Sequence, residues 1–141
     1  MGICLVENLG LLGCSRVQLK WPNDLVYENK KLGGILIDVS GEVGGLNKTA
    51  IGVGLNVNME SFGNKQTDQE WTSLAKIHPD LKISRNTAAA SVIQSICLAI
   101  EKYENSGTQG LSAAWEKYDA LHKKEIMITT PTHEIQAKAK G

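Results

Sequence analysis

Apolar and polar positions along the chain follow two different spacings. Residues 3–12 place their apolar side chains on roughly one helical face, and Gly13 then supplies a stop signal. From residue 17 the helical spacing gives way to short alternating or apolar runs, separated by polar turns and glycines. These runs predict β-strands over residues 17–20, 25–27, 31–39 and 49–57, and the short connections between them predict antiparallel pairing.

Helical spacing returns in the second half of the chain. A short helix is predicted over residues 69–77, and a long one from about Thr87 to Asn105, with Ser84 or Asn86 as its cap. The long helix is expected to lie on the sheet through an apolar stripe formed by Ala89, Val92, Ile93, Ile96, Ile100 and Tyr103.

Two further segments complete the predicted elements. An amphipathic helix is expected over residues 111–121, and strands are expected over residues 125–129 and 134–137. The inward face of this helix is predicted to consist of Leu111, Ala114, Trp115 and Tyr118.

Composition narrows the classes of partner. The 141 residues carry 15 Lys and Arg against 15 Asp and Glu, so the formal net charge is zero and gives no electrostatic footprint for nucleic acid or an anionic membrane. No apolar run approaches the roughly 18 residues needed to cross a bilayer. The three cysteines show neither zinc-ligand nor disulfide spacing. We therefore expect a reducing, cytoplasmic setting and no membrane partner.

A cluster of polar and aromatic residues opens the region between positions 20 and 56. Lys20-Trp21-Pro22-Asn23-Asp24 gathers a cation, an indole and short polar side chains around a turn. This pattern suits the stacking of a planar ligand, but it is also typical of a capped turn with a core tryptophan. Lys31 begins an apolar strand, where a lysine is either a fixed point charge for a carboxylate or phosphate or a solvated strand end. Strict alternation places Lys31 on the same face as Gly33.

Glycines interrupt two strands that are otherwise apolar. Gly33-Gly34 and Gly52-Val53-Gly54 predict either the close approach of a ligand ring or sheet curvature alone, and the sequence favours neither. The second run is no dinucleotide fingerprint, because Val57 occupies the position of the third glycine. Asp38 and Asn56 follow these glycines and are either candidates to position a phosphate, directly or through a metal ion, or simply turn residues.

Taken in order, three segments carry a family resemblance. Residues 20–24 (Lys-Trp-Pro-Asn-Asp), 31–38 (Lys-Leu-Gly-Gly-Ile-Leu-Ile-Asp) and 51–58 (Ile-Gly-Val-Gly-Leu-Asn-Val-Asn) resemble the catalytic domain of biotin protein ligases, also called biotin–[acetyl-CoA carboxylase] ligases. Downstream, Arg85-Asn86-Thr87 and Trp115-Glu116-Lys117-Tyr118-Asp119 resemble the bacterial members. The resemblance covers essentially the whole chain and is strongest from Val17 to Asn58.

The resemblance implies a fold and a division into domains. The expected class is α+β, with a mixed or antiparallel sheet backed by helices, as in class II aminoacyl-tRNA synthetases and biotin ligases. Residues 1–121 are expected to form the C-terminal part of the catalytic domain. Residues 122–141 are expected to begin a small SH3-like β-domain.

The resemblance also implies a reaction. Such enzymes use ATP and Mg²⁺ to convert biotin to biotinyl-5′-AMP, and then transfer biotin to a lysine of a biotin carboxyl carrier protein. Lys31 matches the family's catalytic lysine and Asp24 an active-site aspartate. The remaining matches are, for biotin, Lys31, Gly34, Leu36, Gly52 and Gly54; for the nucleotide, Lys20, Asn23, Asp24 and Asn56; and, as candidate metal ligands, Asp38 and Asn56.

The sequence departs from the family pattern in one important respect. The family's glycine- and arginine-rich loop, which closes over biotin and the adenylate, has no counterpart here, because Arg16 and Arg85 are the only arginines. We therefore expect a fragment of a ligase, and two alternatives stay open: a non-catalytic module that binds biotin, adenylate or a partner, and a related lipoate ligase. A homodimer is plausible through sheet edges near Gly41–Gly45. DNA binding would require a winged helix that this sequence lacks.

Overall fold

The central feature of the fold is a four-stranded antiparallel sheet. The computed structural model describes residues 1–41, 47–61 and 69–140. The strands pair in the order β1-β2-β3-β4, so each strand lies beside the next one in the sequence. Their bounds are β1 Gln18–Lys20, β2 Asp24–Tyr27, β3 Lys30–Gly41 and β4 Asn47–Leu55. The predicted antiparallel meander and the α+β class are confirmed.

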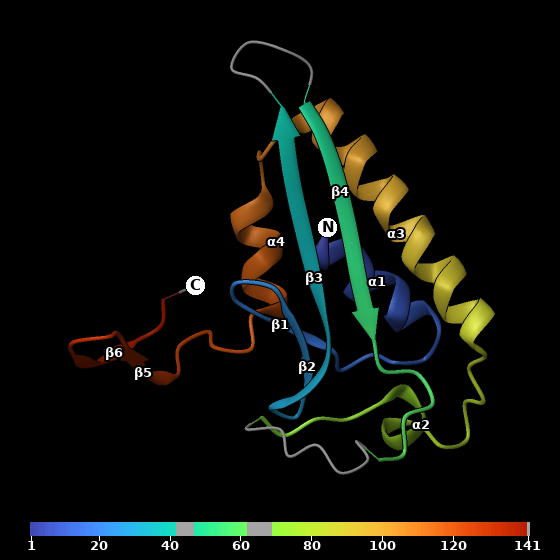
Figure 1. The fold of residues 1–141 in the computed structure, drawn as a ribbon, viewed down its shortest axis with the longest axis horizontal. Coiled ribbons are helices and arrows are strands. Elements are labelled where there is room, and N and C mark those ends of the chain that lie inside the picture. The colour runs from blue at the N-terminus through green and yellow to red at the C-terminus, as the bar shows by residue number, and fades with distance from the viewer. Residues whose placement is uncertain (42–46, 62–68, 141) are drawn as a thin grey trace.

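In the described part of the chain, four helices and a second, smaller sheet accompany the central sheet (Figure 1). The helices are α1 Gly2–Leu11, α2 Leu74–Ile77, α3 Arg85–Ser106 and α4 Leu111–Tyr118. The strands β5 Glu125–Thr129 and β6 Glu134–Lys138 pair only with each other among the described residues, in an antiparallel hairpin. That these strands begin an SH3-like domain, and that a domain boundary lies at residue 122, stay predictions.

The hydrophobic core lies between α1 and the short strands of the sheet. Leu5 and Leu9 of α1 are fully buried, as are Leu25 of β2 and Leu32 of β3. The helix lies close to β1, as the distance at Gly2 shows: a Cβ atom added there would lie 2.9 Å from the Cδ2 atom of Leu19. Residues 3–12 therefore form the buried amphipathic helix that their spacing predicts.

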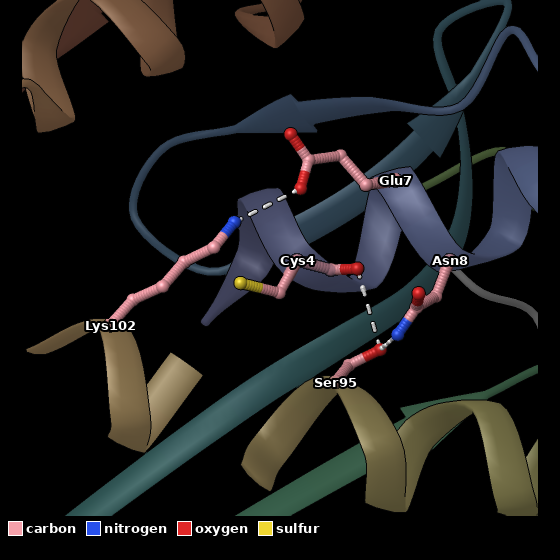
Figure 2. A network of polar contacts seen from close by, with 5 residues as sticks. All are labelled: Cys4, Glu7, Asn8, Ser95 and Lys102. Atoms are coloured by element: carbon pink, nitrogen blue, oxygen red, sulfur yellow. Dashed lines mark hydrogen bonds and ion pairs between the residues drawn. The ribbon is translucent and has the colours of Figure 1, made fainter. Parts of the chain in front are cut away.

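The long helix α3 packs differently from the prediction. Its buried residues are Ala88, Ser91 and Ser95, whereas Ile93 and Tyr103 are 62% and 66% exposed. The helix lies against α1, where the Asn8 side chain donates a 2.8 Å hydrogen bond to the Ser95 hydroxyl (Figure 2). Small residues let two helices approach closely, and the buried polar pair satisfies its own hydrogen bonds. Of the predicted stripe, Val92 does pack against the core, but the expectation that the helix lies on the sheet through its isoleucines is wrong.

The predicted helix over residues 69–77 is half correct. Only Leu74–Ile77 is helical, and Ser73 caps it by accepting a hydrogen bond from the backbone N–H of Lys76. The residues before Ser73 run extended instead, and Trp71 forms a parallel bridge with Lys31. Ser73 could have indicated this start in the sequence, because serine is a preferred N-cap residue and an N-cap marks the point where a helix begins.

Helix α4 ends earlier than predicted, at Tyr118 rather than Leu121. The backbone then pairs with β1, and the N–H of Ala120 donates to the carbonyl oxygen of Leu19 at 2.8 Å. Ala114, Trp115 and Tyr118 pack against the core as expected, whereas Leu111 is exposed. No helix in the described part of the chain is long and apolar enough to cross a membrane. The loop proposed for dimerisation lies outside the described residues except for Gly41.

Replacing Ser84 with alanine tests the start of α3. The Ser84 hydroxyl accepts a 3.0 Å hydrogen bond from the backbone N–H of Thr87, so its loss should lower the free energy of unfolding by about 1 kcal/mol. Urea denaturation followed by circular dichroism measures the change. Ser106→Ala, at the exposed other end of the same helix, is the matched control and should change stability by less than half as much. Equal effects of the two substitutions would contradict the capping role.

Candidate functional site

An ion pair joins the two residues predicted to be catalytic. The ammonium of Lys31, at the start of β3, lies 2.6 Å from Oδ1 of Asp24, at the start of β2. The Asp24 side chain is largely buried, at 15% exposure, whereas the Lys31 side chain is 39% exposed. The other carboxylate oxygen of Asp24 accepts a long, 3.5 Å hydrogen bond from the side chain of Gln69. The Lys31 ammonium is therefore accessible to solvent while the largely buried Asp24 carboxylate holds it in position.

A β-bulge decides which glycine accompanies Lys31. Strand β3 pairs with β2 through Leu25↔Gly33 and Val26↔Lys31, so Leu32 is the extra residue. The bulge breaks strict alternation: a Cβ atom on Gly34 would lie 3.8 Å from Cε of Lys31. A Cβ atom on Gly33 would instead overlap the carbonyl oxygen of Gly54. The predicted pairing of Lys31 with Gly33 on one face is therefore wrong, and Gly34 takes that place.

The residues that match biotin positions share one face of the sheet. Gly34 pairs with Gly54 and Leu36 with Gly52 across β3 and β4, and Asp24 pairs with Gly34 across β2 and β3. Directly paired residues point to the same side. Leu36 is 67% exposed, and nothing lies within 4 Å of a Cβ atom built on Gly54. The glycines leave a bare strip of backbone with Leu36 at one end and Lys31 at the other.

The bare strip opens into a pocket of about 470 Å³, called here the lysine pocket. Two of its residues, the polar Gln69 and the aromatic Trp71, were not identified as site residues from the sequence. Trp71 carries the ammonium of Lys76 at 3.7 Å from its ring centre. The lysine pocket is lined by Lys31, Gly33, Gly34, Gly54, Leu55, Asn56, Gln69 and Trp71.

Two backbone hydrogen bonds to the Glu70–Thr72 segment hold Lys31 in place. Its N–H donates to the carbonyl oxygen of Glu70, and its carbonyl oxygen accepts from the N–H of Thr72, both at 2.8 Å. The Asn56 side chain donates to the carbonyl oxygen of Thr72 at 3.0 Å, and the Asn56 N–H donates to that of Leu32 at 2.9 Å. Asn56 thus lines the pocket and also ties the Glu70–Thr72 segment to β3.

The remaining predicted nucleotide residues lie in a second pocket, of about 400 Å³, called here the edge pocket. Lys20, Asn23 and Asp24 line it together with Leu36. Asp24 therefore borders the edge pocket while its carboxylate is bonded to Lys31, which lines the lysine pocket. Trp21 is 73% exposed, so it is not a core tryptophan.

Asp38 and Asn56, the candidate metal ligands, are far apart. Asp38 pairs with Ala50, whereas Asn56 follows Leu55, which pairs with Gly33. The five residue-to-residue steps from Gly33 to Asp38 span roughly 17 Å of strand, so the two side chains cannot hold one ion. Within the described ranges, no group of three or more His, Cys, Asp or Glu side chains is arranged to hold a metal. The residues present therefore do not fit a shared metal site at these positions.

Comparisons with known proteins point to one family. The Biotin/lipoate A/B protein ligase family matches residues 5–58. The Bifunctional ligase/repressor BirA of Escherichia coli is 32% identical over 141 residues, which is 100% of this chain and 43% of that protein. The Biotin--[acetyl-CoA-carboxylase] ligase of Paracoccus denitrificans is 37% identical over 57 residues, 39% of this chain and 24% of that protein.

Solved structures agree on the fold. The biotin protein ligase of Aquifex aeolicus in complex with biotin and ATP superposes with a TM-score of 0.79 at 22% identity, covering 97% of this chain and 56% of that one. The chain spans less than half the length of the E. coli relative. The family match over residues 5–58 includes the segment that contributes Asp24, Lys31 and the glycine strip.

Proposed function

We propose that this chain, which matches the Biotin/lipoate A/B protein ligase family over residues 5–58 and the E. coli ligase/repressor over its full length, is part of a biotin protein ligase. It would take part in the ATP-dependent activation of biotin to biotinyl-5′-AMP and its transfer to a lysine of a carrier protein. The observation that carries the proposal is the ion pair of Lys31 and Asp24 at the end of a strip of bare backbone. A flat ring and a carboxylate need those two surfaces side by side.

The proposed first step joins two anions. An oxygen of the biotin carboxylate attacks the α-phosphorus of ATP, a new P–O bond forms, and the bond to the departing pyrophosphate breaks. No proton is lost and no covalent enzyme intermediate is required. The barrier lies in bringing negative charges together and aligning them, so fixed positive charge and orientation dominate catalysis.

Lys31 supplies that charge in the proposal. Its backbone is held by β2 on one side and by Glu70 and Thr72 on the other, and its ammonium is held by Asp24. A group that is already in place does not have to reorganise during the reaction. The ammonium would lie between the biotin carboxylate and the α-phosphate. Asp24 is then a positioning residue for Lys31.

The glycine strip is the proposed seat of the biotin ring. Gly34, Gly52 and Gly54 share one face with Leu36, and Gly54 has open space above it. Side chains at these positions would keep a planar ureido ring away from the backbone. Leu36 offers apolar contact to the sulfur-containing ring. In this proposal the carboxylate end of biotin lies toward Lys31.

The lysine pocket is the proposed site for part of the nucleotide. Trp71 offers an indole beside Lys31 and Asn56, and an aromatic face suits a purine ring. Lys20 and Asn23 line the edge pocket on the other side of Asp24, where a cation and a polar group suit phosphate or ribose oxygens. Mg²⁺ is the expected companion of the phosphates, which together with water usually supply most of its ligands.

The proposed acceptor is the lysine of a biotin carboxyl carrier protein. The Paracoccus relative carries acetyl-CoA carboxylase in its name, which supports a carboxylase carrier as the partner. The lysine amine would attack the carbonyl carbon of the mixed anhydride, an amide would form, and AMP would leave with the proton of the amine passing to solvent.

Labelling of a carrier domain tests the substrate. A ligase that contains this sequence is incubated with ATP, Mg²⁺, a carrier domain, and either biotin or lipoate. We expect an avidin-detectable, lysine-linked product with biotin, and an excess of lipoate should leave the yield unchanged. Lipoylation in preference to biotinylation would assign the chain to the lipoate ligases and overturn the proposal.

A second candidate function is a binding module without adenylation. Apolar side chains on both faces of β3 are open, with Ile37 51% and Val39 59% exposed in addition to Leu36. Exposed apolar patches of this kind mark surfaces that another chain or segment covers. Titration calorimetry of the chain with biotin and with biotinyl-5′-AMP distinguishes the two functions. Binding of both ligands without any ATP-dependent release of pyrophosphate, even with the rest of a catalytic domain supplied, would favour the binding module.

A further inference from the structure

A lysine of the short helix α2 lies against the indole that lines the lysine pocket. The ammonium of Lys76 is 3.7 Å from the centre of the Trp71 ring. At that distance the negative face of the ring attracts the cation, and among aromatic side chains tryptophan makes the strongest contact of this kind. Lys76 has no part in the proposed ligation, which uses only the Trp71 ring.

The backbone that carries Trp71 is fixed by the central sheet. Trp71 itself forms a parallel bridge with Lys31 of β3. Three residues later, the N–H of Leu74 donates a 2.9 Å hydrogen bond to the carbonyl oxygen of Asn56, which follows β4. The segment is therefore held at both ends, and the freedom that Trp71 retains is mainly the rotation of its side chain.

The start of α2 holds the backbone of Lys76 in the same way. The buried Ser73 hydroxyl accepts a 3.4 Å hydrogen bond from the N–H of Lys76 and donates a 2.8 Å hydrogen bond to the carbonyl oxygen of Met59. Lys76 therefore reaches the ring from an anchored position. A ring that is already held in the orientation that a ligand requires loses less conformational entropy when the ligand binds.

The ammonium and the pocket contact the indole differently. Among the described residues, Trp71 lines the lysine pocket and Lys76 does not. This indicates that the ammonium lies on a side of the ring that is turned away from the pocket, where it does not compete with a planar base that stacks from the pocket side. Its positive charge also offsets the repulsion between the negative faces of two stacked rings.

We propose that Lys76 is a positioning residue for the adenine base of ATP, because it holds the Trp71 indole in the orientation against which the base stacks. This inference rests on the proposed function, in which Trp71 meets the purine. Lys76 acts through the ring rather than on the phosphates, since its ammonium is engaged by the indole. Without the cation the indole rotates more freely, and the base has to order it as it binds.

Neutral variants of Lys76 test this role in a ligase that contains this sequence. In biotin-dependent pyrophosphate exchange, Lys76→Met and Lys76→Gln should raise the KM for ATP by about fivefold, the size expected for one cation–π contact near the surface, and leave kcat and the KM for biotin unchanged. Lys76→Arg keeps a cation over the ring and should stay within about twofold of the wild type. Lys117→Met is the matched control, because Lys117 makes a similar contact with the Tyr118 ring on α4, at 4.9 Å, and it should change none of these values.

Two inhibitors of the exchange separate a role through the indole from a role at the phosphates. Adenosine carries the purine without phosphates, and tripolyphosphate carries phosphates without a purine. Lys76→Met should weaken inhibition by adenosine about fivefold and leave inhibition by tripolyphosphate unchanged. An unchanged KM for ATP in Lys76→Met, or weaker inhibition by tripolyphosphate, would overturn this inference and leave the proposed function intact. Absence of biotin-dependent exchange in the wild-type ligase would overturn the proposed function, and this inference with it.

Discussion

Replacing Lys31 with methionine is expected to lower the rate of biotinyl-5′-AMP formation by about 100-fold or more, the usual loss when one fixed electrostatic group is removed from a reacting centre. The ammonium is the positive charge that β3 and Asp24 hold beside the glycine strip. Methionine retains much of the length and packing of the side chain and removes only its charge. Single-turnover formation of the adenylate, followed by chromatography, measures the effect in a ligase that contains this sequence.

Lys30 is the matched control for Lys31. It is the preceding residue, and its ammonium makes a 3.8 Å contact with Glu70 at the surface. Lys30→Met should change the rate by less than about threefold, because a solvated ion pair contributes little. Lys31→Arg should fall between the two, since it keeps the charge but alters its position. Equal rates for Lys30→Met and Lys31→Met would show that Lys31 has no special role.

Gly33→Ala is expected to damage the fold rather than the reaction. The new methyl group would overlap the carbonyl oxygen of Gly54, which belongs to the neighbouring strand and cannot rotate away. The strands would have to separate locally, at a cost of about 2–3 kcal/mol in the free energy of unfolding. Urea denaturation of the purified variant measures this loss.

Gly54→Ala is the counterpart that should spare the fold. A Cβ atom at this position meets nothing within 4 Å, so we expect stability to change by less than about 0.5 kcal/mol. The methyl group would occupy the proposed seat of the biotin ring and should weaken biotin binding by about 10-fold, which corresponds to roughly 1.4 kcal/mol. If Gly54→Ala unfolds the chain, or binds biotin as the wild type does, the proposed seat is wrong.

Local signals in the sequence predicted the sheet well. Strand spacing and short turns were enough to place β1 to β4 and their antiparallel order, because consecutive strands with short connections have few other ways to pair. The segments that hold Asp24 and Lys31 were also identified. Their 2.6 Å contact depends on the register of β2 against β3, which periodicity does not determine.

The errors share a physical origin in tertiary contacts. The bulge at Leu32 moves Gly34 rather than Gly33 beside Lys31, and a bulge adds one residue without changing the pattern of residue types. The Glu70–Thr72 segment is extended because it pairs with Lys31. The local spacing of apolar residues carries no information about that pairing. Helix α3 buries Ser91 and Ser95 instead of its isoleucines because α1 lies against that side.

The central claim is that this chain contributes the site at which biotin is adenylated. Biotin-dependent exchange of labelled pyrophosphate into ATP measures that step directly, because exchange requires the adenylate to form and reverse. The chain is tested with the remaining part of a biotin ligase catalytic domain supplied as a second polypeptide. We predict exchange that requires both polypeptides and biotin, and that is lost in Lys31→Met but not in Lys30→Met. Exchange that is absent from the combined wild-type polypeptides, or that proceeds without biotin, would contradict the account.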